Sequence, residues 1–171
     1  MRKHTIINLL KETKKKNLVI AEIGVWQGAL VKKIGQNCRE IISEYWGIDL
    51  FQRSNHRSYR NIDDDTWDTA YWRACRLMRW FPEFHILRMS SIKAFKLFPP
   101  KYFDFVFIDA DHSYKGVMAD INAWLPLVKD GGLLTGHDYG GKRKHPGVKK
   151  AVDECFDKIE LLPGKVWVKR L

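Results

Sequence analysis

The stretch FDFVFIDADH, residues 103–112, begins with an apolar run broken only by Asp104 and ends with two further aspartates and a histidine. Short apolar runs of this kind are typical of central strands in parallel sheets, which helices cover on both faces. The polar residues follow the run directly, so we expect them at the carboxyl end of the strand. Ligands of open α/β sheets bind at that end. The stretch therefore predicts a buried parallel strand with a ligand site at its end.

Strand-like and helix-like patterns alternate along the chain on both sides of this stretch. Strands are expected at residues 18–23, 45–50, 84–89, 103–108, 133–135, 159–162 and 166–171. Helical spacing of apolar residues is expected at 6–15, 30–41, 63–80, 92–97, 117–128 and 147–157, with a turn at 129–132. These lengths predict one α/β domain over residues 1–171. We expect a Rossmann-like, doubly wound, mainly parallel seven-stranded sheet with helices on both faces. Residues 1–17 are expected to pack on its core as an N-terminal helix.

The composition is that of an ordinary globular domain. The 171 residues are 45% hydrophobic and 29% charged, and no apolar run approaches the length of about 20 residues that a membrane helix needs. The first residues are charged and do not resemble a signal peptide. Cys38, Cys75 and Cys155 lie far apart, without the paired spacing of a zinc site or a disulfide framework. We therefore expect a cytoplasmic protein with reduced thiols and no membrane partner.

The net charge of +10 is the unusual bulk property. A positive field attracts anions, so it favours an anionic substrate or nucleic acid, although a solvated basic surface has the same composition. The basic residues form separate clusters, at 14–16, at Arg73, Arg76 and Arg79, at 142–144 and at 149–150. Because aromatics do not interleave with them as in a known nucleic-acid module, a nucleic-acid partner stays open but is not favoured.

Each predicted central strand ends in polar residues or glycine. The first is followed by Gly24 and Gly28, which permit a tight turn, and by a helix whose N-terminal N–H groups are unpaired. Asp49 ends the second strand, where a carboxylate can accept hydrogen bonds from both hydroxyls of a ribose. The loop lacks the Gly-x-Gly-x-x-Gly spacing that cradles a pyrophosphate, which disfavours an NAD-dependent oxidoreductase. A plain strand-to-helix turn is the alternative interpretation of the glycines.

Several motifs in this order resemble class I S-adenosylmethionine (SAM)-dependent methyltransferases. The likeness is closest to the branch called methyltransferase domain 24, and more distant to the metal-dependent O-methyltransferases that act on catechol and caffeoyl-CoA. The motifs are AEIGVWQG at 21–28, FIDADHSY at 107–114, DGG at 130–132, GHDY at 136–139 and GV at 147–148, leading to AVD at 151–153. The resemblance covers residues 18–171. It implies a SAM-dependent methyltransferase that O-methylates a small molecule or a glycan.

The resemblance also implies a role for each matching residue. The cofactor-binding residues would be Glu22, Gly24, Trp26 and Gly28 at the methionine part of SAM, Asp49 at the ribose, Ser90 and Ser91 at the adenine, and, in addition, Leu50, Asp109 and Asp111. His112 and His137 are the candidate bases, with Asp109 beside the methyl donor. A divalent cation could lie on Asp109, His137 and Asp138, where a histidine suits manganese or zinc better than magnesium. The alternative to a metal site is a hydrogen-bonded loop around SAM. The relatives carry an Asp-Asn pair after the fifth strand, and either His137-Asp138 or Asp138-Tyr139 can be aligned with it.

Two other functions stay open at this point. One is a nucleic-acid- or nucleotide-directed methyltransferase, favoured by the charge, although the Asn-Pro-Pro-Tyr signature of amino methylation is absent. The other is a module that binds SAM or an anion without turnover. The chain is short and lacks long lid segments, so its site is expected to be open to a sugar or a larger molecule, or to be closed by another subunit of a homo-oligomer.

Overall fold

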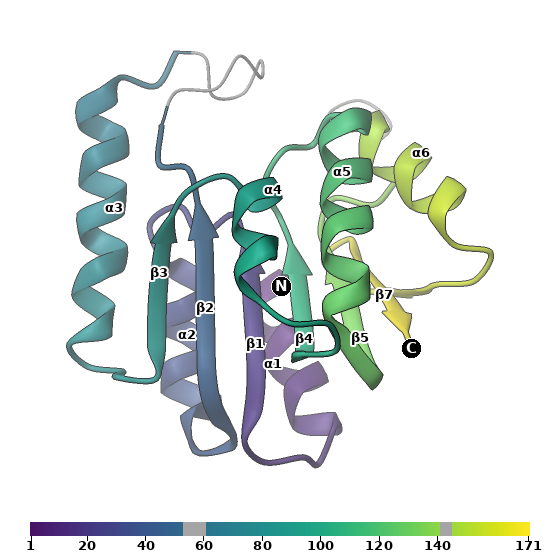
Figure 1. Cartoon of the computed structure of the whole chain (residues 1–171), viewed down its shortest axis with the longest axis horizontal. Helices are drawn as coiled ribbons and strands as arrows, with labels where there is room; N and C mark the ends of the chain where they lie inside the picture. The colour runs from purple at the N-terminus through teal and green to yellow at the C-terminus, as the bar shows by residue number, and fades with distance from the viewer. Residues whose placement is uncertain (53–60, 141–144) are drawn as a thin grey trace.

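The computed structural model describes residues 1–52, 61–140 and 145–171, which form one sheet with helices on both faces (Figure 1). Its strands are β1 (Leu18–Ile23), β2 (Ile42–Asp49), β3 (Phe84–Arg88), β4 (Phe103–Ile108), β5 (Val128–Gly136), β6 (Glu160–Leu162) and β7 (Val166–Arg170). In this described part the sheet has seven strands in the order β3-β2-β1-β4-β5-β7-β6. The pairs from β3 to β5 are parallel, and β7 is antiparallel to both β5 and β6. The predicted Rossmann-like, mainly parallel sheet is confirmed.

Helices form a layer on each face of the sheet. The helices are α1 (Arg2–Glu12), α2 (Ala29–Cys38), α3 (Asp64–Met78), α4 (Ser91–Ala94), α5 (Tyr114–Trp124) and α6 (Pro146–Cys155), with short 3-10 turns at Arg39–Ile41, Phe95–Leu97 and Leu125–Leu127. The first three share one apolar cluster with the sheet, and the last three share the other. The predicted N-terminal helix packs on the core through Ile6, Leu9 and Leu10, which are almost fully buried.

The strand order reverses between β1 and β4, which lie side by side at the centre of the sheet. Because β1 connects outward to β2 while β4 connects outward to β5, the loops that follow β1 and β4 diverge at their carboxyl ends. This divergence is the switch point at which open α/β sheets bind ligands. The predicted location of the site therefore coincides with the topological switch.

The predicted turn at 129–132 is wrong, because residues 128–136 form the single strand β5. The helical pattern was also extended too far, since α5 ends at Trp124. Gly131 has φ +70°, and a register shift interrupts the pairing of β4 with β5 at this point. The Gly131 N–H donates to Leu171 O, so the glycine pair is an irregular point within β5 that pairs with the C-terminus. Local turn chemistry was present, but sheet pairing decided the conformation.

The surface bears part of the predicted basic face. Arg73 and Arg76 are exposed on α3, off its buried stripe of Trp67, Ala70 and Ala74, and Arg79 is exposed directly after the helix. The predicted basic cluster at 142–144 lies outside the described residues. Across the described ranges, helices with the length and apolar character needed to cross a bilayer are absent.

Glu22 lies in the core at the centre of the sheet, within β1. Its side chain is buried, and the Tyr45 hydroxyl donates a hydrogen bond of 2.5 Å to Glu22 Oε2. Burial raises the pKa of Glu22 to about 8, an effect that the Tyr45 hydrogen bond opposes and that the charge of Asp109 reinforces. Glu22 therefore carries a proton in the folded protein at neutral pH.

Glu22→Gln is expected to gain stability relative to the parent protein as the pH rises. The folded-state pKa of about 8 exceeds the ordinary 4.5, so the stabilisation that Glu22 gives is full below pH 4.5 and is lost as the pH rises through 8. Glutamine has no proton to lose. The difference in unfolding free energy between variant and parent should grow by about 2–4 kcal/mol from pH 5 to pH 8. Urea unfolding of both proteins at each pH measures it, and a constant difference would contradict the buried neutral acid.

Candidate active site

The loops after β1 and β4 touch directly at the switch point. The Gly24 N–H donates to Ile48 O, and the Asp109 N–H donates to Ile23 O, each at 2.8 Å. Gly24 has φ +96°, and a Cβ placed on it would lie 2.4 Å from Asp109 O. The glycine is thus required by the approach of the Asp109 backbone as well as by its own conformation. This contact holds the two predicted halves of the site against each other.

Gly24→Ala is expected to destabilise the fold, because the new methyl group meets backbone atoms that cannot move aside. We expect a loss of about 2–4 kcal/mol in unfolding free energy. Gly140→Ala is a matched control, since Gly140 also has a positive φ but a Cβ there would meet open space. Denaturant unfolding compares the two variants, and equal losses would show that conformational strain alone determines the effect.

Asp49 binds two backbone amides at the end of β2. Its Oδ2 accepts a hydrogen bond from the Trp26 N–H and its Oδ1 accepts one from the Phe51 N–H, each at 2.8 Å. Both donors have a positive φ, 51° for Trp26 and 46° for Phe51. Burial raises the pKa of Asp49 against the lowering effect of these backbone hydrogen bonds. Each carboxylate oxygen has a second lone pair, so Asp49 can shape both loops and still accept a further donor.

The glycine loop also contacts α3 at its outer side. The Trp26 ring packs edge-on against Trp67, with centroids 4.7 Å apart. Arg73 donates a hydrogen bond of 2.9 Å to Gln27 Oε1. Gln27 and Arg73 line a hollow of about 390 Å³ together with Asp63, Asp65, Thr66 and Thr69. Sequence reasoning had placed Arg73 only on an exposed face, and its contact with the loop depends on how α3 packs.

The predicted adenine-side residues take part in contacts between helices. Ser91 donates a hydrogen bond to Asp120, a buried residue of α5 whose pKa burial raises to about 6. Ser90 is the N-terminal capping residue of α4, and Leu50 is 43% exposed at the end of β2. The structure thus brings Leu50, Ser90 and Ser91 to the edge that carries Asp49, since Met89 N–H donates to Asp49 O. Asp120 was missed because a lone aspartate on an apolar helix has no distinctive spacing.

Asp111 lies at the start of α5 and is exposed. Its two carboxylate oxygens accept hydrogen bonds from the Ser113 N–H and the Ser113 hydroxyl, at 2.8 and 2.9 Å. Ser113 in turn caps the helix by accepting from the Gly116 N–H. The observed contacts of Asp111 therefore stabilise a helix start, and its predicted contact with SAM stays a prediction.

The four predicted catalytic and metal residues come together at the ends of β4 and β5. His137 Nδ1 lies 3.4 Å from Asp109 Oδ1 and 3.3 Å from Asp138 Oδ2. His112 Nε2 lies 3.1 Å from Asp138 Oδ2 and 3.6 Å from Asp109 Oδ1. The four side chains are between 8 and 18% exposed. Two imidazoles thus alternate with two carboxylates in a mostly buried cluster.

Burial and charge act in opposite directions in this cluster. Burial lowers the pKa of His112, but the hydrogen bonds and charges of Asp109 and Asp138 outweigh it and raise that pKa to about 9. The pKa of His137 is raised for the same reasons. Burial raises the pKa of each carboxyl group, but the neighbouring imidazoles prevail and lower the pKa of both Asp109 and Asp138. The carboxylates are therefore ionised at neutral pH.

Arg2 reaches this cluster from the start of α1. Its guanidinium forms an ion pair with Asp109 Oδ2 and lies 3.4 Å from His137 Nδ1. A Cβ on Gly164, in the turn between β6 and β7, would lie 2.8 Å from Arg2 N, so that turn packs closely on the beginning of α1. Sequence reasoning missed Arg2 because 107 residues separate it from its partner.

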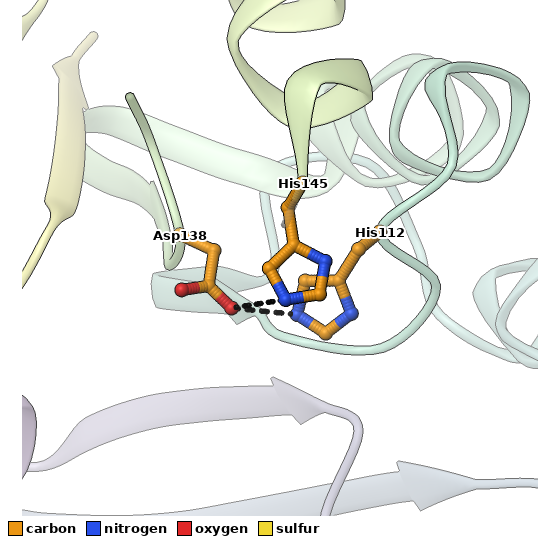
Figure 2. Close-up of side chains that lie close together, drawn as sticks. All are labelled: His112, Asp138 and His145. Carbon is orange, nitrogen blue, oxygen red and sulfur yellow. Dashed lines mark ion pairs between the residues drawn. The ribbon is translucent and has the colours of Figure 1, made fainter. Parts of the chain in front are cut away.

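His145 is a further residue that sequence reasoning missed. It precedes α6, its Nε2 lies 3.6 Å from Asp138 Oδ2, and its ring centroid lies 4.2 Å from that of His112 (Figure 2). The described residues include two groups whose ligand atoms all lie within 4.8 Å of one another. One is the predicted set of Asp109, His137 and Asp138, and the other consists of His112, Asp138 and His145.

A family model described as a methyltransferase domain, that of methyltransferase domain 24, matches residues 21–139. The chain belongs to this methyltransferase family. Its members are class I SAM-dependent enzymes, so the resemblance seen in the sequence motifs is confirmed. The match begins one residue before Glu22 and ends one residue after Asp138, so it spans every predicted site residue.

Individual relatives of this methyltransferase differ strongly in sequence. An uncharacterized protein of Acanthamoeba polyphaga mimivirus is 28% identical over 92% of this chain and 67% of its own. The O-methyltransferase NovP has a similar structure, with a TM-score of 0.72 at 18% identity over 99% of this chain and 78% of its own. The structure of a putative caffeoyl-CoA O-methyltransferase from Staphylococcus aureus is also similar, with a TM-score of 0.69 at 15% identity over 99% of this chain and 83% of its own. At these identities the solved structures show a shared fold.

Proposed function

We propose that this methyltransferase transfers the SAM methyl group to an oxygen of a small molecule or a glycan. The observation that carries the proposal is the direct contact of the glycine loop with the Asp109 backbone. This contact places two groups on adjoining loops at one edge of the sheet. One is the Asp49 carboxylate, which is suited to bind a ribose, and the other is the acid–base cluster around Asp109. A structure of the TDP-rhamnose 3'-O-methyltransferase CalS11, with a TM-score of 0.62 at 16% identity over 98% of this chain and 79% of its own, supports a sugar as one acceptor class.

The residues at the first half of the site fit SAM. Gly24 and Gly28 have left-handed backbone, and Asp49 keeps acceptor capacity at the end of β2. Glu22 is a neutral buried acid beneath the loop, so its proposed role is to support the loop from below. SAM supplies an activated methyl group on a sulfonium, which needs no phosphate cradle. The absence of the pyrophosphate-type glycine pattern from residues 24–28 agrees with this cofactor.

Of the two candidate bases, His112 and His137, we propose His137 as the base. It is 18% exposed, against 8% for His112, so an acceptor can reach it more easily. Its Nδ1 faces Asp109 and Asp138, which orient the ring and raise its pKa, so Nε2 takes the proton of the acceptor hydroxyl once the ring is neutral, at a higher pH than an ordinary histidine needs. Asp109 is thus proposed as a positioning residue for the base as well as a neighbour of SAM. Alignment of donor and acceptor at close range supplies most of the remaining rate gain.

A divalent cation at Asp109, His137 and Asp138 would meet Arg2. The spacing of these three ligand atoms suits a metal, but the Arg2 guanidinium is already paired with Asp109 and lies near His137 Nδ1. A cation there would face that positive charge at short range. We therefore propose that Arg2 neutralises the charge of Asp109. A metal ion at this edge of the sheet would then bind Asp138 together with its other neighbours, His112 and His145.

Isothermal titration calorimetry with SAM, its demethylated product and NAD tests the cofactor. We expect both sulfur nucleosides to bind and NAD not to bind, and the reverse order would overturn the proposal. Transfer of a labelled methyl group to a panel of phenols, sugars and nucleotide sugars then tests the acceptor class. Binding of SAM without transfer to any acceptor in the panel would favour a module without turnover.

A nucleic-acid acceptor is the second candidate, because the net charge is +10 and Arg73, Arg76 and Arg79 lie exposed on α3 and directly after it. Methyl transfer to RNA or DNA that survives physiological salt would favour it. A mobility shift that disappears at high salt without sequence preference would show only non-specific attraction. A cytoplasmic location and a homo-oligomeric state remain predictions from the sequence.

A further inference from the structure

Two imidazoles from separate loops approach one carboxylate oxygen of Asp138, which also lies 3.3 Å from Nδ1 of the proposed base His137. His112 follows β4, Asp138 follows β5, and His145 precedes α6. Figure 2 shows both imidazoles directed at the same oxygen of Asp138, with Nε2 of His112 at 3.1 Å and Nε2 of His145 at 3.6 Å. The two rings lie against each other, with an interplanar angle of 35°. Three donors thus converge from parts of the chain up to 33 residues apart.

The backbone holds this arrangement independently of the charges. A Cβ placed on Gly147, in the first turn of α6, would lie 2.4 Å from Tyr114 N and 2.9 Å from His112 O. The N-terminal end of α6 therefore packs directly on the loop that carries His112. Asp138 has φ +59°, a conformation uncommon for residues other than glycine that recurs at functional sites. Close packing and a turned backbone both direct the donors toward one point.

The distances between the three ligand atoms match the spacing of ligands around a metal ion, and the shorter of them also allows a hydrogen bond between His112 and Asp138. N–H···O hydrogen bonds cluster near about 2.9–3.0 Å. Ligands held about 2.0–2.1 Å from a tetrahedral zinc ion lie about 3.3–3.4 Å from one another. The observed 3.1 and 3.6 Å bracket this value, and the three ligand atoms all lie within 4.8 Å. The side chains are 8, 17 and 15% exposed, so an ion would be largely shielded from water but could still enter.

We propose that His112, Asp138 and His145 form a binding site for a first-row transition-metal ion, with Zn²⁺ and Co²⁺ as the ions of choice. Two imidazoles and one carboxylate favour such ions over Mg²⁺ and Ca²⁺, which prefer oxygen ligands. The site shares Asp138 with the acidic set but avoids Asp109, whose carboxylate is paired with Arg2. Three protein ligands leave open positions, where a bound metal would activate an acceptor hydroxyl as a Lewis acid. Metal binding itself does not depend on the proposed methyl transfer.

Titration of the chelator-stripped, full-length protein with Co²⁺ tests the site. We expect one ion per chain, with ligand-field absorption in the visible that Zn²⁺ displaces and that excess Mg²⁺ does not. His145→Ala should lower the Co²⁺ affinity at least about 10-fold, since even partners outside the ligand sphere contribute 10–100-fold. Asp138→Asn should do the same. His4→Ala is the matched control, because His4 is exposed on α1, and it should bind Co²⁺ as the parent does.

Two further variants separate this site from the acidic set. Arg2→Ala should leave the Co²⁺ affinity within about 3-fold of the parent, whereas an ion on Asp109 would bind more tightly once the competing guanidinium is removed. Loss of binding in His137→Ala with full binding in His145→Ala would likewise overturn the proposal, as would a parent protein that retains no Co²⁺. SAM calorimetry on the same metal-free samples reports on folding and on the cofactor site, so a failed metal site is distinguished from a failed methyltransferase.

Discussion

Asp49→Ala is expected to weaken SAM binding by at least about 100-fold. A carboxylate that accepts hydrogen bonds from two ribose hydroxyls contributes about 1.5–3 kcal/mol through each of them, and alanine removes both. The same substitution releases the amides of Trp26 and Phe51, which Asp49 holds at 2.8 Å. We therefore also expect a loss of about 2 kcal/mol in unfolding free energy. Calorimetric titration with SAM measures the first effect and denaturant unfolding measures the second.

The two roles of Asp49 can be separated by a milder substitution. Asp49→Asn keeps one carbonyl oxygen, so it should retain part of the loop structure and still bind SAM at least about 10-fold more weakly, because the charge is lost. Asp157→Asn is a suitable control, since this carboxylate is exposed after α6. SAM affinity that is unchanged in Asp49→Ala, in a protein that remains folded, would refute the ribose assignment.

His137→Ala is expected to lower the rate of methyl transfer by about 10²–10³-fold while the SAM affinity stays within about 3-fold. The imidazole lies between Asp109 and Asp138 at 3.4 and 3.3 Å, which is the arrangement of an oriented base rather than of a cofactor contact. Turnover with the acceptor found in the panel, together with SAM calorimetry, measures the two quantities separately.

Chemical rescue distinguishes a base from a structural histidine at this position. Free imidazole added to His137→Ala should restore part of the rate if the missing group transfers a proton. His137→Gln should stay slow, because an amide preserves hydrogen bonding but does not titrate. A His137→Ala protein that keeps the parent rate would show that His137 is not the base. If His137→Gln is as fast as the parent while His137→Ala is slow, the role of the side chain is packing.

The composition of the site combines residues that are near in sequence with residues that are far apart. Asp109 and His112 belong to one loop, as do His137 and Asp138, so two motifs were enough to predict that they would gather after β4 and β5. Arg2 and His145 complete the cluster from α1 and from the start of α6. These two additions alter the chemistry, because Arg2 neutralises Asp109 and His145 gives Asp138 a third imidazole beside those of His112 and His137.

The sequence by itself determined the sheet, its layers and the edge of the sheet at which the candidate site lies. Apolar runs and helical spacing are local properties, and the carboxyl ends of parallel strands meet at one edge whatever the details of packing. It also determined the family, since the motifs around Gly24, Asp109 and Asp138 keep their order and spacing.

Only the tertiary structure decided which side chains meet in the site. The contact of Arg2 with Asp109, the approach of His145 to His112 and the strand through Gly131 all depend on packing between segments distant in the chain. No local pattern encodes such contacts, because their geometry is set by the rigid placement of whole helices and strands on the sheet. For the same reason, Asp49 holds the loops of the site in addition to its predicted role toward a ribose.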